Sequence, residues 1–138
     1  MDFSFSEHQT LLREALASFS AKELLPNYTR WDRAGEFPAE LWPKLAGMGV
    51  FGLRVPEAYG GQGMPYLEAG LAIEQIAKGD FNLCYGILNS CFAGDILGRF
   101  ASPGLCEQWL RPMAAGEKIL CVCLTEPHCG SDAAAIRT

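Results

Sequence analysis

The sequence is short of basic residues, with 11 Lys and Arg against 16 Asp and Glu and a net charge of −5. A protein that binds the phosphate backbone of a nucleic acid needs a basic face, so this balance argues against nucleic-acid binding. An anionic ligand would have to be held by backbone N–H groups or by a helix N-terminus instead. With 49% apolar and 20% charged residues over 138 positions, the composition predicts a folded domain rather than disorder.

The sequence also lacks a recognisable targeting peptide and a long uninterrupted apolar run. Residues 1–13 mix charged and aromatic side chains. The most apolar region, residues 81–100, contains Asn82, Asn89 and Asp95, which predicts a buried helix and no membrane span. Without a secretory signal, the 6 cysteines are expected to be reduced thiols in a cytoplasmic protein.

Residue clusters typical of metal or nucleophilic chemistry are scarce. No C-x-x-C pair occurs, and the grouping of Cys121 and Cys123 with His128 and Cys129 does not match the usual zinc-ligand spacings, so no metal site is predicted. Only His8 and His128 could serve a catalytic triad, and neither has an evident acidic partner. His8 is expected to be solvated on an exposed helical turn.

Hydrophobic periodicity and capping residues predict a mainly α fold of about five helices. Ser6 and Gln9 have the spacing of a capping box, Asp80 is placed to cap the fourth helix, and Ser102 to cap the fifth. The fourth helix is apolar on nearly all sides and carries glycines that would let neighbouring helices approach closely, so it belongs at the centre of a bundle. The predicted helices cover residues 6–25, 38–49, 65–79, 81–100 and a stretch that begins at 102–103, while residues 27–37 are expected to form a connector.

The pattern changes at Gly116. Residues 119–124 are apolar and partly β-branched, which predicts a strand followed by a polar turn over 125–132. One strand cannot stand alone, because its edges need partners. We therefore expect an all-α domain over residues 1–116 and the incomplete beginning of a β domain over residues 117–138, as in a fragment of a longer protein.

The glycine-rich loop Gly60–Gly63 could be taken for a phosphate cradle. It lacks the Walker lysine and the strand–turn–helix spacing of a dinucleotide site. A tight turn with glycines at positive φ is the favoured interpretation.

The turn over residues 124–132 combines polar groups that a flavin could use. The Thr125 hydroxyl could bond the polar edge of the ring, and N–H groups around Gly130 and Ser131 could accept a pyrophosphate. A capped turn in which Thr125 and Ser131 bond local backbone explains the same residues, and spacing alone favours it. Glu126 is expected to bond backbone rather than act as a catalyst.

Taken together, the two loops resemble those of the acyl-CoA dehydrogenase family. Residues 55–63 (VPEAYGGQG) are similar to that family's VPExYGGxG loop, and residues 124–132 (LTEPHCGSD) to its LTEPxxGSD signature. The resemblance covers essentially the whole chain. It implies a longer protein with an N-terminal helical domain, a middle β domain and a C-terminal helical bundle, which binds FAD and oxidises an acyl-CoA thioester to its α,β-enoyl product.

The resemblance also implies roles for individual residues. Thr125 would contact the flavin ring, and the backbone at Val122 and Leu124 would line it. Gly130 and Ser131 would meet the pyrophosphate, and Ser131 would also approach the CoA portion of the substrate. At His128–Cys129 the sequence departs from the two small residues that many relatives carry there.

In relatives the fourth helix and its neighbours line part of the acyl pocket. Tyr85, Leu88 and Phe92 fall at i, i+3 and i+7 on one helical face, so they could lie under the acyl group, although packing in the core explains them equally well. If they line the pocket, the bulk of Tyr85 and Phe92 would favour a short, branched or cyclic acyl group.

The family's catalytic carboxylate removes the substrate α-proton while a hydride leaves for the flavin. It lies in the C-terminal bundle of relatives, so no residue here is assigned to catalysis and the chain alone is not expected to turn over substrate. The resemblance further implies an electron-transfer flavoprotein as acceptor and a homotetramer when intact; an oxidase using oxygen shares the fold. Two other interpretations stay open: a non-catalytic helical module that binds protein, and an independent zinc- or phosphate-binding domain.

Overall fold

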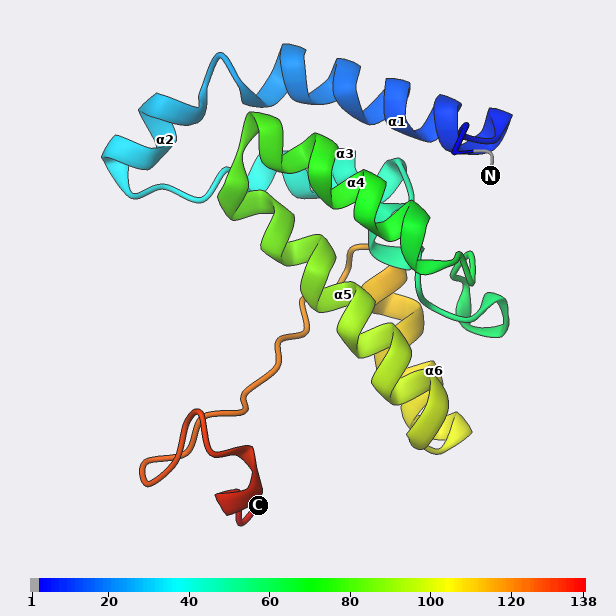
Figure 1. Cartoon of the computed structure of the whole chain (residues 1–138), viewed down its shortest axis with the longest axis vertical. Helices are drawn as coiled ribbons and strands as arrows, with labels where there is room; N and C mark the ends of the chain where they lie inside the picture. The colour runs from blue at the N-terminus through cyan, green and yellow to red at the C-terminus, as the bar shows by residue number, and fades with distance from the viewer. Residues whose placement is uncertain (1–2) are drawn as a thin grey trace.

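The computed structural model describes residues 3–138, and this part of the chain contains six α-helices and no β-strand. The mainly α fold is therefore confirmed, with α4 packed between α1 and α5, and α5 packed against α6 (Figure 1). The helices are α1 (Glu7–Phe19), α2 (Tyr28–Ala34), α3 (Trp42–Gly47), α4 (Tyr66–Gly79), α5 (Phe81–Phe100) and α6 (Pro103–Ala114).

The helix starts follow the predicted caps. Ser6 accepts a hydrogen bond from the Gln9 N–H while the Gln9 side chain accepts from the Ser6 N–H, which completes the capping box of α1. The Asp80 carboxylate accepts from the N–H of Asn82 at 2.8 Å at the start of α5, and Ser102 caps α6. A π-helical turn, Ser20–Leu24, continues α1, so the first predicted helix is confirmed over nearly its full length.

The predicted connector over residues 27–37 is wrong in one respect, because it contains α2. Trp31 of this helix is 5% exposed and packs into the main core, and Gly35 ends the helix at a φ of 64°. The helix has 7 residues, about two turns, which is too short for a periodic pattern to show. Packing of Trp31, rather than local propensity, stabilises it.

The fourth predicted helix is α5, and glycines allow its neighbours to approach as expected. A Cβ at Gly86 would lie 2.6 Å from the Trp42 ring, and a Cβ at Gly94 would lie 2.9 Å from the backbone of Arg54. Any larger residue at these positions would push α5 away from the segments that it touches. None of the helices in residues 3–138 is long and apolar enough to cross a membrane.

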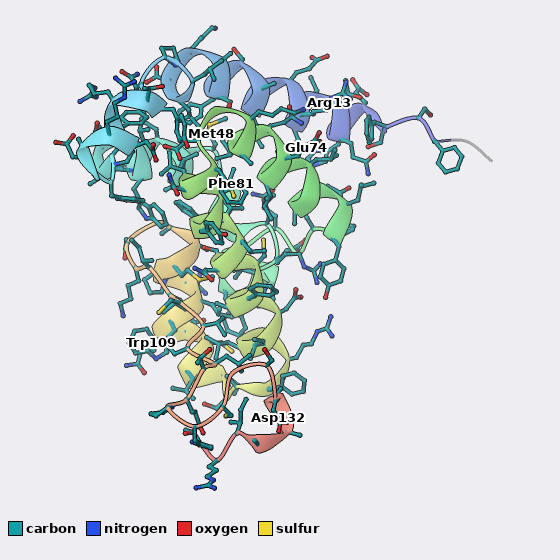
Figure 2. The ribbon with its side chains drawn as sticks, turned by 60° about the vertical axis from the view of Figure 1, so that its left-hand side comes forward. Arg13, Met48, Glu74, Phe81, Trp109 and Asp132 are labelled. Carbon is teal, nitrogen blue, oxygen red and sulfur yellow. The ribbon has the colours of Figure 1, made fainter. Side chains whose placement is uncertain are left out.

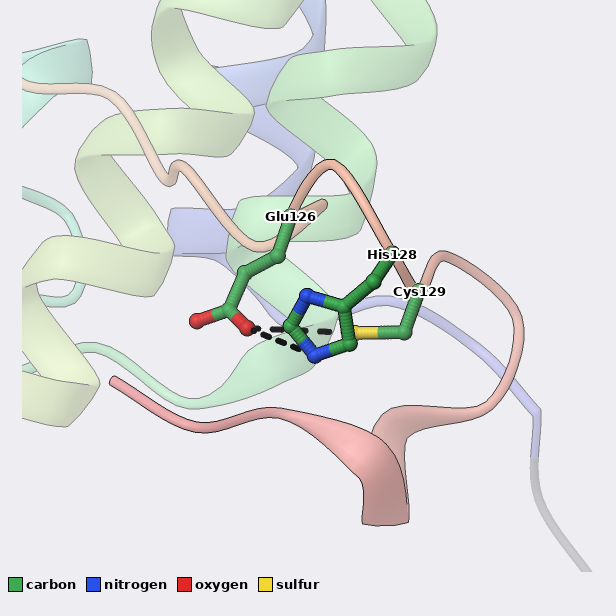
Figure 3. Close-up of side chains that lie close together, drawn as sticks. All are labelled: Glu126, His128 and Cys129. Carbon is green, nitrogen blue, oxygen red and sulfur yellow. Dashed lines mark hydrogen bonds and ion pairs between the residues drawn. The ribbon is translucent and has the colours of Figure 1, made fainter.

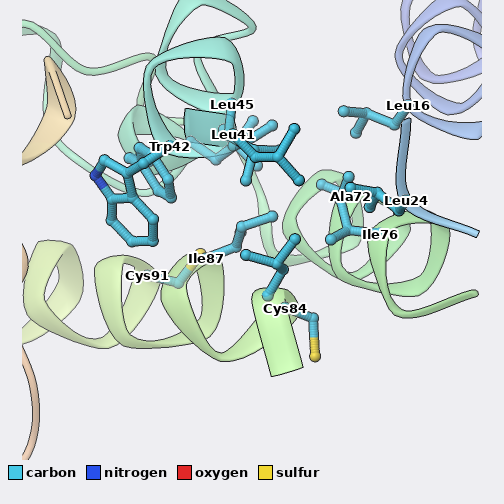
Figure 4. Packing of buried hydrophobic residues seen from close by; sticks show 14 of the residues in the cluster. Leu16, Leu24, Leu41, Trp42, Leu45, Ala72, Ile76, Cys84, Ile87 and Cys91 are labelled. Atoms are coloured by element: carbon cyan, nitrogen blue, oxygen red, sulfur yellow. The ribbon is translucent and has the colours of Figure 1, made fainter. Parts of the chain in front are cut away.

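Two apolar clusters lie along α5. The larger cluster joins α1, α2, α3, α4 and the first half of α5, and Figure 4 shows Leu16, Leu45, Ile76 and Ile87 within it. The smaller cluster joins the second half of α5 to α6 and includes Leu110. All 6 cysteines are free thiols. Burial raises the pKa of the Cys91 thiol to about 11, so at neutral pH it packs as a small apolar side chain.

An ion pair between Arg54 and Asp95 ties the segment before α4 to the middle of α5. The side chains are 13% and 17% exposed, the guanidinium also donates to the Met64 carbonyl, and it lies 3.9 Å over the ring of Tyr66. The hydrogen bond with Asp95 raises the pKa of Arg54 further above its ordinary value. The two charged groups are thus paired with each other where the backbone at Arg54 packs against α5.

The predicted strand over residues 119–124 does not form. After α6 the chain runs as an irregular trace with one 3-10 turn, Ala133–Ala135, near the C-terminus (Figure 1), and its one β-bridge, within residues 3–138, joins Glu126 to Cys129. Ile119 and Leu124 are 62% and 59% exposed. The apolar, β-branched composition is typical of a strand, but the described residues offer no neighbouring strand to accept its hydrogen bonds.

Candidate functional site

The glycine-rich loop is a tight turn whose N–H groups are used internally. Gln62 donates to the Gly52 carbonyl at 2.9 Å and Gly63 to the Val55 carbonyl at 2.9 Å, while Gly60 has a φ of 81°. At Gly61 a Cβ would overlap the Val55 carbonyl. Because these amides point back into the loop, they do not form a phosphate cradle, and the tight-turn interpretation is confirmed.

The turn over residues 125–132 differs from the glycine-rich loop, because N–H groups in its second half are not used internally. Glu126 and Cys129 exchange backbone hydrogen bonds of 3.0 and 3.2 Å, which closes a four-residue turn around Pro127. The turn folds Gly130 back toward Thr125, since a Cβ at Gly130 would lie 3.8 Å from the Thr125 methyl group. Within the described part of the chain, the N–H groups of Gly130 and Ser131 donate to no other residue.

The five residues predicted to contact flavin therefore lie along one exposed segment. Thr125, Gly130 and Ser131 sit at the turn, with Val122 and Leu124 on the extended stretch that leads to it. The structure brings Thr125 and Gly130 together, while Leu124 remains solvent-exposed. Free amides in the same turn as a threonine hydroxyl fit an anionic, hydrogen-bonding ligand such as the diphosphate and ring edge of FAD.

The Glu126 carboxylate holds this turn to the end of the chain. It accepts hydrogen bonds from the N–H of Arg137 at 3.1 Å and from the N–H and hydroxyl of Thr138. The bond from the Thr138 hydroxyl, followed by that from the Arg137 N–H, lowers the pKa of Glu126 below its ordinary value. The expected role of Glu126, bonding to backbone, is thus confirmed.

An apolar hollow connects the extended stretch to the helices. It has a volume of about 420 Å³, and Val122 and Leu120 line one side while Ile96 of α5 and Trp109 of α6 line the other. Trp109 is labelled in Figure 2, above the C-terminal segment that carries Asp132. The hollow therefore lies where α5 and α6 face Val122, one of the residues predicted to contact flavin.

The three residues predicted to line an acyl pocket face outward from α5. Tyr85 is 50% and Phe92 47% exposed, and Leu88 is half-buried, so these side chains are not part of the buried core. Phe81 and Ile96, also largely exposed, extend the same face, and the rings of Phe81 and Tyr85 meet edge to face at 5.4 Å. We call this face, made of Phe81, Tyr85, Leu88, Phe92 and Ile96, the α5 apolar stripe. Ile96 belongs to both the stripe and the hollow.

The cysteine and histidine side chains of the C-terminal segment, Cys121, Cys123, His128 and Cys129, divide into two groups. The Sγ atoms of Cys121 and Cys123 lie 3.8 Å apart, and their mutual hydrogen bond raises the pKa of Cys121. A separate cluster joins His128 and Cys129 to Glu126 (Figure 3), with the three candidate ligand atoms all within 4.8 Å of one another. From the sequence alone, Cys121 and Cys123 were placed in one group with His128 and Cys129, and that group did not include Glu126. His8 is exposed, as expected.

In comparisons with known proteins, one family model matches most of the chain. The model for the acyl-CoA dehydrogenase N-terminal domain matches residues 6–117. The human mitochondrial short-chain specific acyl-CoA dehydrogenase is 38% identical over 133 residues, which cover 95% of this chain and 32% of that protein. The chain thus spans about a third of the length of this relative, and the matched domain stops before the turn that contains Thr125.

Solved structures agree with this match. The butyryl-CoA dehydrogenase of Megasphaera elsdenii superposes with a TM-score of 0.89 at 30% identity, covering 100% of this chain and 37% of that one. PigA in complex with FAD superposes with a TM-score of 0.85 at 30% identity, covering 96% of this chain and 36% of that one.

Proposed function

Because the chain belongs to the acyl-CoA dehydrogenase family through its N-terminal domain, we propose that it is the N-terminal part of an FAD-dependent enzyme that dehydrogenates an acyl-CoA thioester. In this proposal residues 117–138 open a β domain, and the strand over 119–124 forms once partner strands are present. The family of FAD-dependent relatives supports the cofactor, and the acyl-CoA relatives support the substrate class.

The observation that carries the proposal is the course of the α5 apolar stripe. An apolar face that a folded domain leaves open calls for a ligand or another protein surface. The stripe ends at Ile96, in the hollow that Val122 lines, so an acyl chain lying on it would reach the segment proposed to hold the flavin. Tyr85, Leu88 and Phe92 would contact the acyl group, and the bulk of the two aromatic rings favours a short, branched or cyclic one.

The proposed cofactor contacts are the Thr125 hydroxyl, the backbone at Val122 and Leu124, and the free amides of Gly130 and Ser131. When bound, FAD supplies the acceptor for the hydride that leaves the substrate β-carbon. The residues of this chain hold and orient the ligands: the Thr125 hydroxyl bonds the ring edge, the amides donate hydrogen bonds to the diphosphate, and Ser131 approaches the CoA portion. The proton-abstracting carboxylate is proposed to lie outside these residues, so the 138-residue chain alone is expected to be inactive.

The experiment uses the polypeptide encoded by the natural reading frame that contains this sequence. Purified protein should be yellow, and its flavin absorption should bleach when butyryl-CoA is added without oxygen. Thr125→Ala should weaken FAD binding at least tenfold, whereas Ser4→Ala, remote from the turn in sequence, should not. Absence of FAD uptake by folded protein would overturn the proposal. Rates that peak with long acyl chains would overturn the assignment of Tyr85 and Phe92.

The electron acceptor is proposed to be an electron-transfer flavoprotein, and the intact enzyme a homotetramer. Slow reoxidation of the bleached protein in air, with fast reoxidation on adding that flavoprotein, would support a dehydrogenase. Fast reoxidation by oxygen alone would indicate an oxidase instead.

A non-catalytic helical module is the second candidate, since the exposed stripe would also suit a protein partner. It predicts a protein that takes up no FAD and that loses a partner when Tyr85 and Phe92 are both replaced by Ser. FAD uptake therefore separates the two candidates.

A further inference from the structure

The turn that follows the extended stretch brings three different metal-ligating groups together. Glu126, His128 and Cys129 contribute a carboxylate, an imidazole and a thiol (Figure 3). The distance from His128 Nε2 to Glu126 Oε2 is 3.4 Å, and the distance from Cys129 Sγ to the same oxygen is 4.0 Å. The paired backbones of Glu126 and Cys129 set this geometry, because they fold the two side chains onto one side of the turn.

These separations are close to those that a tetrahedral zinc ion requires. Bond lengths of about 2.3 Å to sulfur and about 2.0–2.2 Å to nitrogen and oxygen place neighbouring ligand atoms roughly 3.3–3.6 Å apart. The imidazole–carboxylate distance of 3.4 Å already meets this value. The remaining separations between ligand atoms, all within 4.8 Å, would have to shorten by about 1.5 Å or less, which side-chain rotation allows.

We propose that Glu126, His128 and Cys129 form a binding site for a divalent transition-metal ion of the zinc class. The fourth position would face solvent, since His128 is exposed and Cys129 half-buried. An incomplete protein shell with one solvent position is a common arrangement for zinc held by three side chains.

The surroundings of the three ligands are consistent with this role. Hydrogen bonds from the N–H groups of Arg137 and Thr138 orient the Glu126 carboxylate, as supporting hydrogen bonds do at metal sites. His128 Nε2 lies 3.1 Å from the Ala135 carbonyl, and this contact is given up when the metal binds. The imidazole then keeps its proton on Nδ1, and the Cys129 thiol releases its proton to solvent as it becomes a thiolate ligand.

This site does not rest on the proposed function. The metal ligands are side chains of Glu126, His128 and Cys129, whereas the proposed flavin contacts are the Thr125 hydroxyl and the amides of Gly130 and Ser131. Metal binding is therefore measurable on the 138-residue chain whether or not it binds FAD.

The test is a titration of the reduced chain with Co²⁺, followed by displacement with Zn²⁺. Binding through a thiolate gives a sulfur-to-cobalt charge-transfer band in the near ultraviolet, and a tetrahedral site gives strong visible bands. We expect both bands at one equivalent and their loss when Zn²⁺ is added. Cys129→Ala should abolish the charge-transfer band, and His128→Ala and Glu126→Gln should weaken binding at least tenfold.

The matched control removes the other exposed thiols. The double variant Cys121→Ala/Cys123→Ala should keep the Co²⁺ spectrum of the unaltered chain, and far-ultraviolet circular dichroism should show that every variant retains its helices. Absence of a charge-transfer band in the unaltered chain would overturn the proposal. So would a band that survives Cys129→Ala but disappears in the double variant, because that result would place the metal on Cys121 and Cys123.

Discussion

The helical region, residues 3–117, and the C-terminal segment, residues 118–138, are held together by different interactions. In the first, Ile87 is fully buried in an apolar cluster that joins five helices; in the second, Ile119 is 62% exposed. The second is ordered mainly by hydrogen bonds to one carboxylate, Glu126. Apolar side chains stabilise a fold only where packing removes them from water, so composition alone does not show which region is stable.

Matched isoleucine substitutions give the largest expected difference between the regions. Ile87→Ala should lower the free energy of unfolding by about 4 kcal/mol, because it leaves a cavity in the larger cluster. Ile119→Ala should change it by less than about 0.5 kcal/mol. Urea unfolding of both variants, monitored by helical circular dichroism, measures the difference. Equal losses would mean that residues 118–138 contribute to the core.

Breaking the Arg54–Asp95 pair should have the next largest effect on the free energy of unfolding. Arg54→Met leaves the Asp95 carboxylate partly buried without its main partner and should cost about 3 kcal/mol. The control is Lys78→Met, which removes the exposed i,i+4 pair with Glu74 and should cost less than about 1 kcal/mol. The comparison uses the same urea midpoints. A loss for Arg54→Met as small as for Lys78→Met would show that solvent screens the first pair as well.

Two helical glycines should respond to alanine with opposite signs. Gly94→Ala places a Cβ 2.9 Å from the Arg54 backbone and should destabilise the chain by about 1–3 kcal/mol. Gly70→Ala meets no atom within 4 Å on the exposed side of α4 and should stabilise it by roughly 0.5–1 kcal/mol. Thermal unfolding of the two variants gives the signs directly, and a stabilising Gly94→Ala would contradict the close packing at α5.

Acid is expected to have the smallest effect on global stability, but to loosen the C-terminal segment locally by protonating Glu126. Hydrogen bonds depress the pKa of Glu126 in the folded chain, so their contribution is complete above the ordinary value of 4.5 and is lost as the pH falls through the lower folded value. Amide exchange at Arg137 and Thr138, compared at a pH above 4.5 and at a pH below the depressed folded pKa of Glu126 after correction for intrinsic rates, should show loss of protection while α4 and α5 keep theirs.

A matched pair of substitutions checks the same interaction without acid. Glu126→Ala should remove the protection at neutral pH, whereas Asp132→Asn, which neutralises another acidic side chain of the turn, should leave it. Protection that persists in Glu126→Ala would show that other contacts order the C-terminal segment.

The features that were predicted correctly from the sequence are local ones. Ser6, Asp80 and Ser102 cap their helices because a cap requires only a side chain and an N–H two or three residues away. The turn of the glycine-rich loop likewise depends on neighbouring residues and on positive φ at Gly60. The proposed flavin contacts at Thr125 and Ser131 came from resemblance and stay predictions.

The features that were missed depend on residues far apart in the chain. The α2 helix needs Trp31 to pack into the core, and the strand over 119–124 fails without a partner strand. Arg54 meets Asp95 across 41 positions. The metal-ligand cluster is the exception, because Glu126, His128 and Cys129 lie within four positions; their side chains meet through the backbone pairing of Glu126 with Cys129, which residue spacing alone does not show.

By itself the sequence determined where most helices begin and end, which faces are apolar, and the family resemblance of the two loops, because these follow from short-range spacing and residue type. Only the tertiary structure decided which apolar residues are buried and which remain open on the α5 apolar stripe. It also decided which polar groups meet and which amides stay free. Burial and long-range pairing depend on the path of the whole chain, and residue type constrains that path without specifying it.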